Sequence, residues 1–138
     1  MKIPSSDIQL VRLPAAECFR VATTSICLPL GLAYISSCLK DRGFKVDILD
    51  AVGEAPKNRT GYFKGYLVGL GLKEVVEKIN PNTLAIGISV IFTHEWPVAV
   101  KLVSLIKEKF PNIPVILGGE HISALPEFSM NTSSADYI

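Results

Sequence analysis

The stretch from Thr83 to His121 constrains the fold more than any other part of the chain. It holds two short apolar runs, Leu84–Ile88 and Val115–Leu117, separated by a segment with the spacing of an amphipathic helix. Two parallel strands need a connection of a dozen or more residues, and a helix usually supplies it. The pattern therefore predicts a strand–helix–strand crossover in a parallel sheet.

Both predicted strands end in residues with small or hydroxyl-bearing side chains. Gly87 and Ser89 close the first strand, and Gly118–Gly119 follow the second. Ligands of open α/β sheets bind beyond the carboxyl ends of the strands. Short side chains at two such ends indicate that a large ligand approaches the backbone there, although strand-end glycines also serve purely structural purposes.

The composition excludes several classes of partner. The 138 residues suit one domain, and the formal charge of +1 gives no electrostatic reason to expect nucleic acid or a membrane surface. No apolar run approaches the roughly 18 residues of a membrane-spanning helix. Cys18, Cys27 and Cys38 fit no common metal-ligand spacing. We therefore expect a cytoplasmic protein with reduced thiols.

The rest of the chain continues the alternation of strands and helices. We expect further strands at Ile8–Leu13 and Phe44–Leu49, and the start of a fifth at Ala135–Ile138. The helical spacing predicts helices at residues 29–42, Leu72–Ile79, Glu95–Lys109 and, interrupted by Pro126, Ile122–Met130.

Two segments carry no clear period. Ala15–Leu28 and Asp50–Gly71 are predicted to be long loops, the second with at most a helical turn at Tyr62–Leu67. The whole pattern predicts an α/β fold, a Rossmann-like (flavodoxin-like) doubly wound parallel sheet in the order 2-1-3-4-5 with the fifth strand truncated. The unfinished strand indicates a fragment of a longer protein.

Three motifs stand in order along this pattern: LGLAYISSCLKDRGFKVDILD at Leu30–Asp50, the segment Ile86–Thr93, and VILGGEH at Val115–His121. Together with ALPE at Ala124–Glu127 and the final ADYI, they resemble the N-terminal cobalamin-binding domain of many radical S-adenosylmethionine enzymes. The resemblance covers about residues 30–138, except the loop rich in glycine and aromatic residues within Asp50–Gly71.

The wider family of cobalamin-binding domains carries D-x-H-x-x-G, S-x-L and G-G. Its histidine is the lower ligand of cobalt, its serine can bind the displaced nucleotide tail, and its glycines let the tail pass the backbone. Here Ser89–Ile91 and Gly118–Gly119 match the last two motifs. When the first motif is laid to end on Gly31, Ile26 and Leu28 replace the aspartate and the histidine. This resembles the radical enzymes, in which cobalt commonly lacks a protein histidine.

The resemblance implies a cobalamin site at the strand ends, with no metal ligand and no catalytic residue from this chain. His94 and His121 are expected to be surface or capping residues, and His121 is the better candidate for touching the cofactor. The residues expected to contact cobalamin are Leu28, Pro29, Leu30, Gly31, Ser89, Val90, Ile91, Thr93, Gly118, Gly119, Glu120 and His121.

The chain has no cysteine triad for an iron–sulfur cluster, no P-loop and no recognisable nucleophile–base pair. We therefore expect residues 1–138 to bind and not to catalyse. The resemblance implies a downstream domain of the same protein that holds a four-iron four-sulfur cluster and S-adenosylmethionine. The cobalamin would then carry a methyl group from S-adenosylmethionine to a substrate.

Three other interpretations stay open at this point. A flavodoxin-like domain could hold the phosphate of a flavin with the hydroxyls of Thr23–Ser25. A receiver-like regulatory domain would need an acidic pair after the first strand, where only Glu17 stands, and an aspartate after the third, where the residues are Ile88–Val90. The third is an interaction domain that has lost its cofactor.

Overall fold

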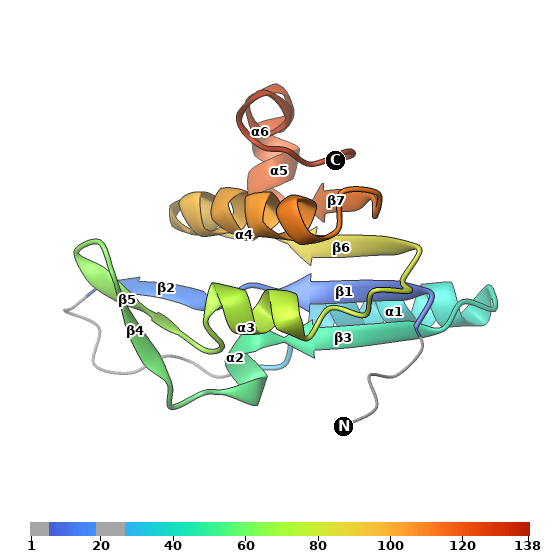
Figure 1. The fold of residues 1–138 in the computed structure, drawn as a ribbon, viewed down its shortest axis with the longest axis horizontal. Helices are drawn as coiled ribbons and strands as arrows, with labels where there is room; N and C mark the ends of the chain where they lie inside the picture. Colours follow the sequence, from blue (N-terminus) through green and yellow to red (C-terminus); the bar gives the residue numbers. More distant parts are fainter. Residues whose placement is uncertain (1–5, 19–26) are drawn as a thin grey trace.

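The computed structural model describes residues 6–18 and 27–138. Its strands are β1 (Ile8–Arg12), β2 (Ala15–Cys18), β3 (Val46–Asp50), β4 (Arg59–Tyr62), β5 (Gly65–Val68), β6 (Ala85–Ser89) and β7 (Val115–Gly118). Its helices are α1 (Leu30–Asp41), α2 (Ala51–Glu54), α3 (Leu72–Glu77), α4 (Trp96–Lys109), α5 (Glu120–Ala124) and α6 (Pro126–Thr132), with a 3-10 turn η1 (Thr93–Glu95) before α4. The strands form a parallel sheet in the order β3-β1-β6-β7 and an antiparallel sheet in the order β2-β5-β4 (Figure 1).

β1 lies at the centre of the parallel sheet. Its Leu10 is opposite Ile48 of β3 and Gly87 of β6, and β6 pairs in turn with β7. A parallel bridge joins Ile116 of β7 to Tyr137, where the sequence predicts the beginning of the fifth strand. These pairings confirm the predicted α/β class and the strand order 2-1-3-4-5.

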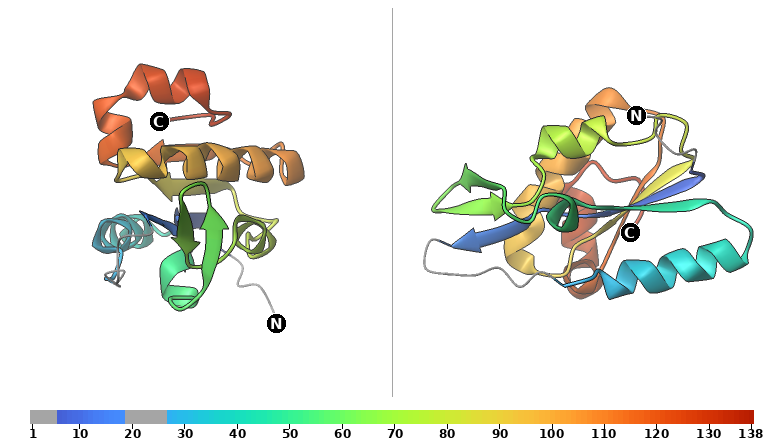
Figure 2. Two further views of the ribbon diagram at one scale, coloured as in Figure 1. Left: turned by 90° about the vertical axis from the view of Figure 1, so that its left-hand side faces the viewer. Right: turned by 90° about the horizontal axis from the view of Figure 1, so that it is seen from below.

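Helices pack on both faces of this sheet, with α1 on one face and α3 and α4 on the other (Figure 2). α4 buries Val98, Leu102 and Ile106 completely, a stripe with the spacing of one helical face. α1 covers its face less fully. Only Leu32 and Ser36 are buried on it, and several of its large apolar side chains are exposed.

The antiparallel sheet is the main departure from the sequence prediction. Ala15–Leu28 and Asp50–Gly71 are predicted as loops, but they supply β2 and the β4–β5 hairpin. The helical turn predicted at Tyr62–Leu67 is wrong, because the chain reverses at Phe63–Lys64 and β5 pairs with a strand on each side. Each of these strands has four residues, and β4 is largely exposed. No apolar alternation therefore marks them in the sequence.

This small sheet lies beyond the carboxyl ends of the parallel strands. β2 follows β1 after residues 13–14, and Figure 1 shows the arrows of β1, β3 and β6 pointing toward it. It therefore stands at the edge of the parallel sheet where ligands of such folds bind.

Prolines and a glycine mark the ends of two helices. α6 begins at Pro126, which confirms the predicted break before it. Pro29 is the residue before α1 and not its first residue. Gly43, with a φ of 91°, donates its N–H to the carbonyl oxygen of Lys40, which confirms the predicted C-terminal cap.

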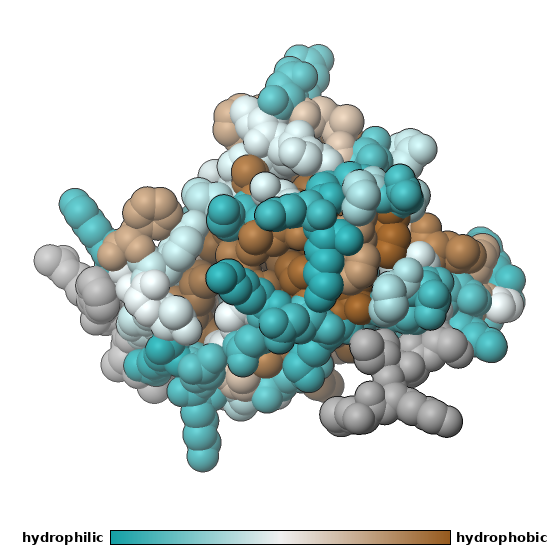
Figure 3. Space-filling view, viewed as in Figure 1, coloured by the Kyte–Doolittle hydropathy of each residue, from teal (hydrophilic) through white to brown (hydrophobic). Residues whose placement is uncertain are grey.

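On the face that carries α3 and α4, apolar side chains are visible between the two helices and hydrophilic ones surround them (Figure 3). The charged residues that line the hollow between these helices are Lys73, Glu77, Glu108 and Lys109. Charges of both signs keep this surface hydrated. Of the helices in the described ranges, none is long and apolar enough to cross a membrane.

The Asp136 carboxylate holds the last residues against β7. It accepts hydrogen bonds from the Val115 N–H at 2.8 Å and from Lys107 Nζ at 3.0 Å, and these contacts, the first above all, lower the pKa of Asp136. Ionised Asp136 therefore stabilises the fold above its ordinary pKa, and this contribution is lost as the pH falls through the lowered value.

We expect Asp136→Asn to reduce the free energy of unfolding by about 1 kcal/mol at neutral pH, a small value because the group is partly exposed.

Urea unfolding at neutral pH and at about pH 3 measures this contribution, which should shrink in acid. Asp41→Asn is the matched control, because Asp41 is an exposed aspartate at the end of α1. Equal losses of stability in the two variants at neutral pH would contradict the role of Asp136.

Candidate functional site

A groove of about 410 Å³ lies between α1 and the parallel sheet. Strands β1, β6 and β7 form its floor, and α1 forms its side. Most of its lining side chains are apolar, among them Leu10, Ile35, Leu39 and Ile116. We call it the α1 groove.

A second cavity of about 340 Å³ lies at the carboxyl ends of the strands. Its lining includes Arg12, Cys27, Leu28, Phe92 and Glu95, and is more polar than that of the α1 groove. The residues Gly31, Leu32, Ser89 and Ile91 line both cavities. The second cavity, which we call the mouth cavity, therefore adjoins the α1 groove.

The two glycines after β7 have different structural roles. Gly119 has a φ of 114° and a ψ of 178°, a conformation that is essentially restricted to glycine. A Cβ atom on Gly119 would lie 2.3 Å from the carbonyl oxygen of Val90. A Cβ atom on Gly118 would meet nothing within 4 Å. Gly119 is thus required by the backbone, whereas Gly118 leaves space in the α1 groove.

His121 connects the turn after β7 to the loop after β6. Its side chain is buried, and its Nδ1 lies 3.2 Å from Thr93 Oγ1. Its ring packs 4.9 Å from that of Trp96, with Phe128 on another side. The Nε2 atom is buried without a hydrogen-bond partner. His121 lines neither the α1 groove nor the mouth cavity, so its visible role is to hold the loop that carries Thr93.

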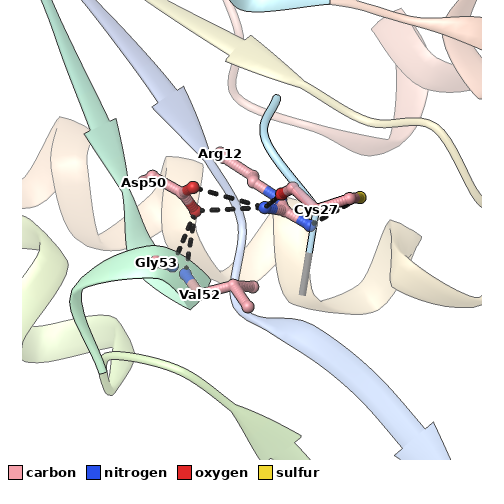
Figure 4. A network of polar contacts seen from close by, with 5 residues as sticks. All are labelled: Arg12, Cys27, Asp50, Val52 and Gly53. Atoms are coloured by element: carbon pink, nitrogen blue, oxygen red, sulfur yellow. Dashed lines mark hydrogen bonds and ion pairs between the residues drawn. The ribbon is translucent and has the colours of Figure 1, made fainter. Parts of the chain in front are cut away.

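Arg12 connects three segments at the end of β1 (Figure 4). Its Nη1 donates to the Cys27 carbonyl oxygen at 2.7 Å and lies 3.3 Å from Asp50 Oδ2. Asp50 also accepts hydrogen bonds from the N–H groups of Val52 and Gly53, which caps α2. The guanidinium therefore fixes the segment that leads into α1, on the wall of the mouth cavity.

Glu95 is the acidic group of the mouth cavity. Burial raises the pKa of Glu95, and the N–H of Phe92 at 3.5 Å and the nearby charges of His94 and Arg12 oppose this rise. A half-buried carboxyl group can accept a hydrogen bond from a ligand N–H, and the guanidinium of Arg12 can donate one. The mouth cavity therefore offers polar partners of both kinds.

Most residues predicted to bind the cofactor lie on these two cavities. Leu28, Pro29 and Leu30 line the mouth cavity, Gly118, Gly119 and Glu120 line the α1 groove, and Gly31, Ser89 and Ile91 line both. Val90, Thr93 and His121 line neither. Thr23–Ser25 and Ile26 lie outside the described residues.

Sequence reasoning missed Arg12, Phe92 and Glu95, and also the apolar wall that α1 provides. Ile35 and Leu39 are four positions apart on α1 and so lie on one face of the helix. This spacing could have predicted the apolar wall. No sequence pattern could have identified Arg12 and Glu95 as site residues. They are far apart in the sequence, and only the fold brings them to one cavity.

Comparison with known protein families matches residues 18–138 to the B12 binding domain. The match covers most of the chain, and the chain belongs to the B12-binding domain family. Vitamin B12 is a cobalamin, so the match confirms the predicted resemblance to cobalamin-binding domains. The class of the parent enzyme stays a prediction. A comparison with curated proteins found no match.

The contrast between the two glycines is testable. We expect Gly119→Ala to lower the free energy of unfolding by about 2 kcal/mol or more, because the Cβ atom collides with the Val90 carbonyl in a conformation that disfavours alanine. Gly118→Ala should change it by no more than about 0.5 kcal/mol. Chemical unfolding of the two variants measures the difference, and equal effects would show that the turn does not need glycine at 119.

Proposed function

We propose that this chain binds cobalamin with the nucleotide tail in the α1 groove and the corrin ring over the mouth cavity. The observation that carries the proposal is that an apolar groove adjoins a more polar cavity, at the carboxyl ends of parallel strands, in a B12-binding domain. Each cavity has a volume in the lower part of the range of small-molecule sites, roughly 300–1,000 Å³.

The residues of the two cavities fit the two chemical parts of the cofactor. The tail ends in an aromatic base, which suits the apolar side chains of the α1 groove. The Ser89 hydroxyl and the open surface at Gly118 lie where the groove joins the mouth, so the linker of the tail can pass close to the backbone. The corrin ring carries amide side chains, for which Arg12 and Glu95 offer a donor and an acceptor.

We further propose that cobalt is held without a histidine from this chain. Leu28, at the position of the ligand histidine in other cobalamin-binding domains, is 78% exposed and lines the mouth cavity. Its side chain has no lone pair. His94 lines a different cavity, beside the β4–β5 hairpin, and His121 is buried against Trp96. These positions support the proposal for the described residues.

The motifs also support a role in a larger protein. We propose that the chain is the cobalamin-binding domain of a radical S-adenosylmethionine enzyme, whose iron–sulfur cluster and S-adenosylmethionine belong to another domain. The cobalamin would supply a carrier for a methyl group. The residues of this chain would bind and orient it and exclude water from its tail, without a catalytic residue of their own. The family match favours cobalamin binding over the flavin and receiver-like interpretations.

Gly118→Val tests the path of the tail. A Cβ atom at this position meets nothing within 4 Å and Gly118 lines the α1 groove, so we expect the valine to weaken cobalamin binding at least about tenfold while the free energy of unfolding changes little. Titration with hydroxocobalamin, followed by visible absorption, measures the affinity.

Gly61→Val is the matched control, because a Cβ atom on Gly61 also meets nothing within 4 Å and Gly61 lies on β4, away from both cavities. Its affinity should equal that of the parent chain. If Gly118→Val bound cobalamin as tightly as Gly61→Val, the proposed path of the tail would be wrong.

A second test concerns the lower face of the cobalt. Cobalamin reduced by one electron and bound to this chain should give an electron paramagnetic resonance spectrum without nitrogen superhyperfine splitting, because Leu28 cannot coordinate and the base of the tail is in the α1 groove. A triplet splitting would show that a histidine or the base of the cofactor coordinates the metal. Leu28→His is the positive control, since it restores a nitrogen at this position and should introduce the splitting.

A further inference from the structure

We propose that the α1 groove selects among cobamides by the chemistry of their lower base, and that it prefers bases with few hydrogen-bonding groups. Cobamides share a corrin ring and differ in this base, which can be a benzimidazole, a phenol or a purine. The inference rests on the proposed function, because it assumes that the tail enters the α1 groove. It adds the class of ligand that the site accepts.

The α1 groove follows the parallel strands from their carboxyl ends to their amino ends. Ser89 lies at one end of β6 and Ala85 at the other, and both line the groove. At a rise of about 3.3 Å per residue the groove is about 13 Å long. Ile8 is the partner of Ala85 in the sheet and lines the groove as well. The end farthest from the mouth cavity is therefore at Ile8 and Ala85, and we call it the deep end.

The polar side chains of the groove are confined to the end near the mouth. Among the described lining residues, Ser89 and Glu120 are the polar ones, and both lie at or beyond the carboxyl ends of their strands. The deep end is lined by aliphatic side chains, including Ile8, Leu39 and Ala85. The backbone groups of β1 are engaged with β3 and β6 on both sides, so the floor there offers few further partners.

This distribution discriminates against a purine at the deep end. Adenine carries an exocyclic amine and several ring nitrogens, which lose water when they enter an apolar groove and find no side chain to replace it. Dimethylbenzimidazole has a single ring nitrogen with a free lone pair, and p-cresol, attached through its oxygen, has no donor at all. Both present mainly apolar surface, whose burial is favourable.

A series of four corrinoids tests the inference on the 138-residue chain. Cobalamin and p-cresolyl cobamide should both bind more tightly than adeninyl cobamide, because dimethylbenzimidazole has one acceptor nitrogen to desolvate and the cresol base has no ring nitrogen. Adeninyl cobamide should bind at least about tenfold more weakly than cobalamin, which corresponds to about 1.4 kcal/mol. Cobinamide, which lacks the tail and its base, should also bind at least about tenfold more weakly, since it leaves the groove empty.

Variants of two isoleucines give a matched comparison. Ile116→Thr introduces a hydroxyl into the lining of the groove while keeping a β-branched residue in β7. It should reduce the ratio of the adeninyl and cobalamin dissociation constants by about threefold. Ile138→Thr makes the same change at a residue that is similarly exposed but does not line the groove, and it should leave the ratio unchanged.

The outcomes separate the inference from the proposed function. If adeninyl cobamide bound as tightly as cobalamin, the inferred selectivity would be wrong, but the proposed binding of cobamides would still hold. Binding of cobinamide as tight as that of cobalamin would show that the tail is outside the groove, and would overturn the inference while corrin binding stood. If none of the four bound, the proposed function would fail and the inference with it.

Discussion

The backbone contact between Gly119 and Val90 fixes the geometry on which the site depends. The Val90 N–H donates to the Gly118 carbonyl, and the His121 N–H donates to the Val90 carbonyl, so the ends of β6 and β7 are joined on both sides of Gly119. No side chain fits at residue 119 between these strand ends. Gly118, which has no side chain, leaves the α1 groove open beside this junction.

The separation of charge from apolar surface follows from the same strand ends. Within the parallel sheet the backbone groups satisfy one another, and α1 can cover them with aliphatic side chains. Arg12 and Asp50 are the last residues of β1 and β3, and Glu95 follows β6 in η1. All three positions, at or beyond the end of the sheet, are partly exposed to solvent. A partly exposed ion pair such as Arg12–Asp50 contributes little stability. Its structural effect is therefore mainly to orient the Cys27 carbonyl and the segment that enters α1.

The parallel sheet could be predicted from the sequence because its strands are buried apolar runs separated by helices of readable period. β2, β4 and β5 could not, since β2 pairs with residues some fifty positions away and β4 is exposed. The motifs located most of the site. The sequence gives Gly118 and Gly119 a single shared role, whereas in the structure Gly119 is required by the backbone and Gly118 leaves space in the α1 groove. The prediction of His121 as a surface or capping residue is wrong about the surface, because the side chain is buried. Its packing on Trp96 depends on the turn after β7 and the start of α4.

The position of β1 in the middle of the sheet has a consequence for folding. β1 is the first strand of the described chain, yet it pairs with β6, which begins at Ala85. During synthesis β1 therefore leaves the ribosome well before β6, with which it completes its hydrogen bonds. Until β6 is made, the apolar side chains of β1 stay exposed. Pairings so distant in sequence slow folding because a long loop must close first. We expect the parallel sheet, and with it the α1 groove, to assemble late and cooperatively.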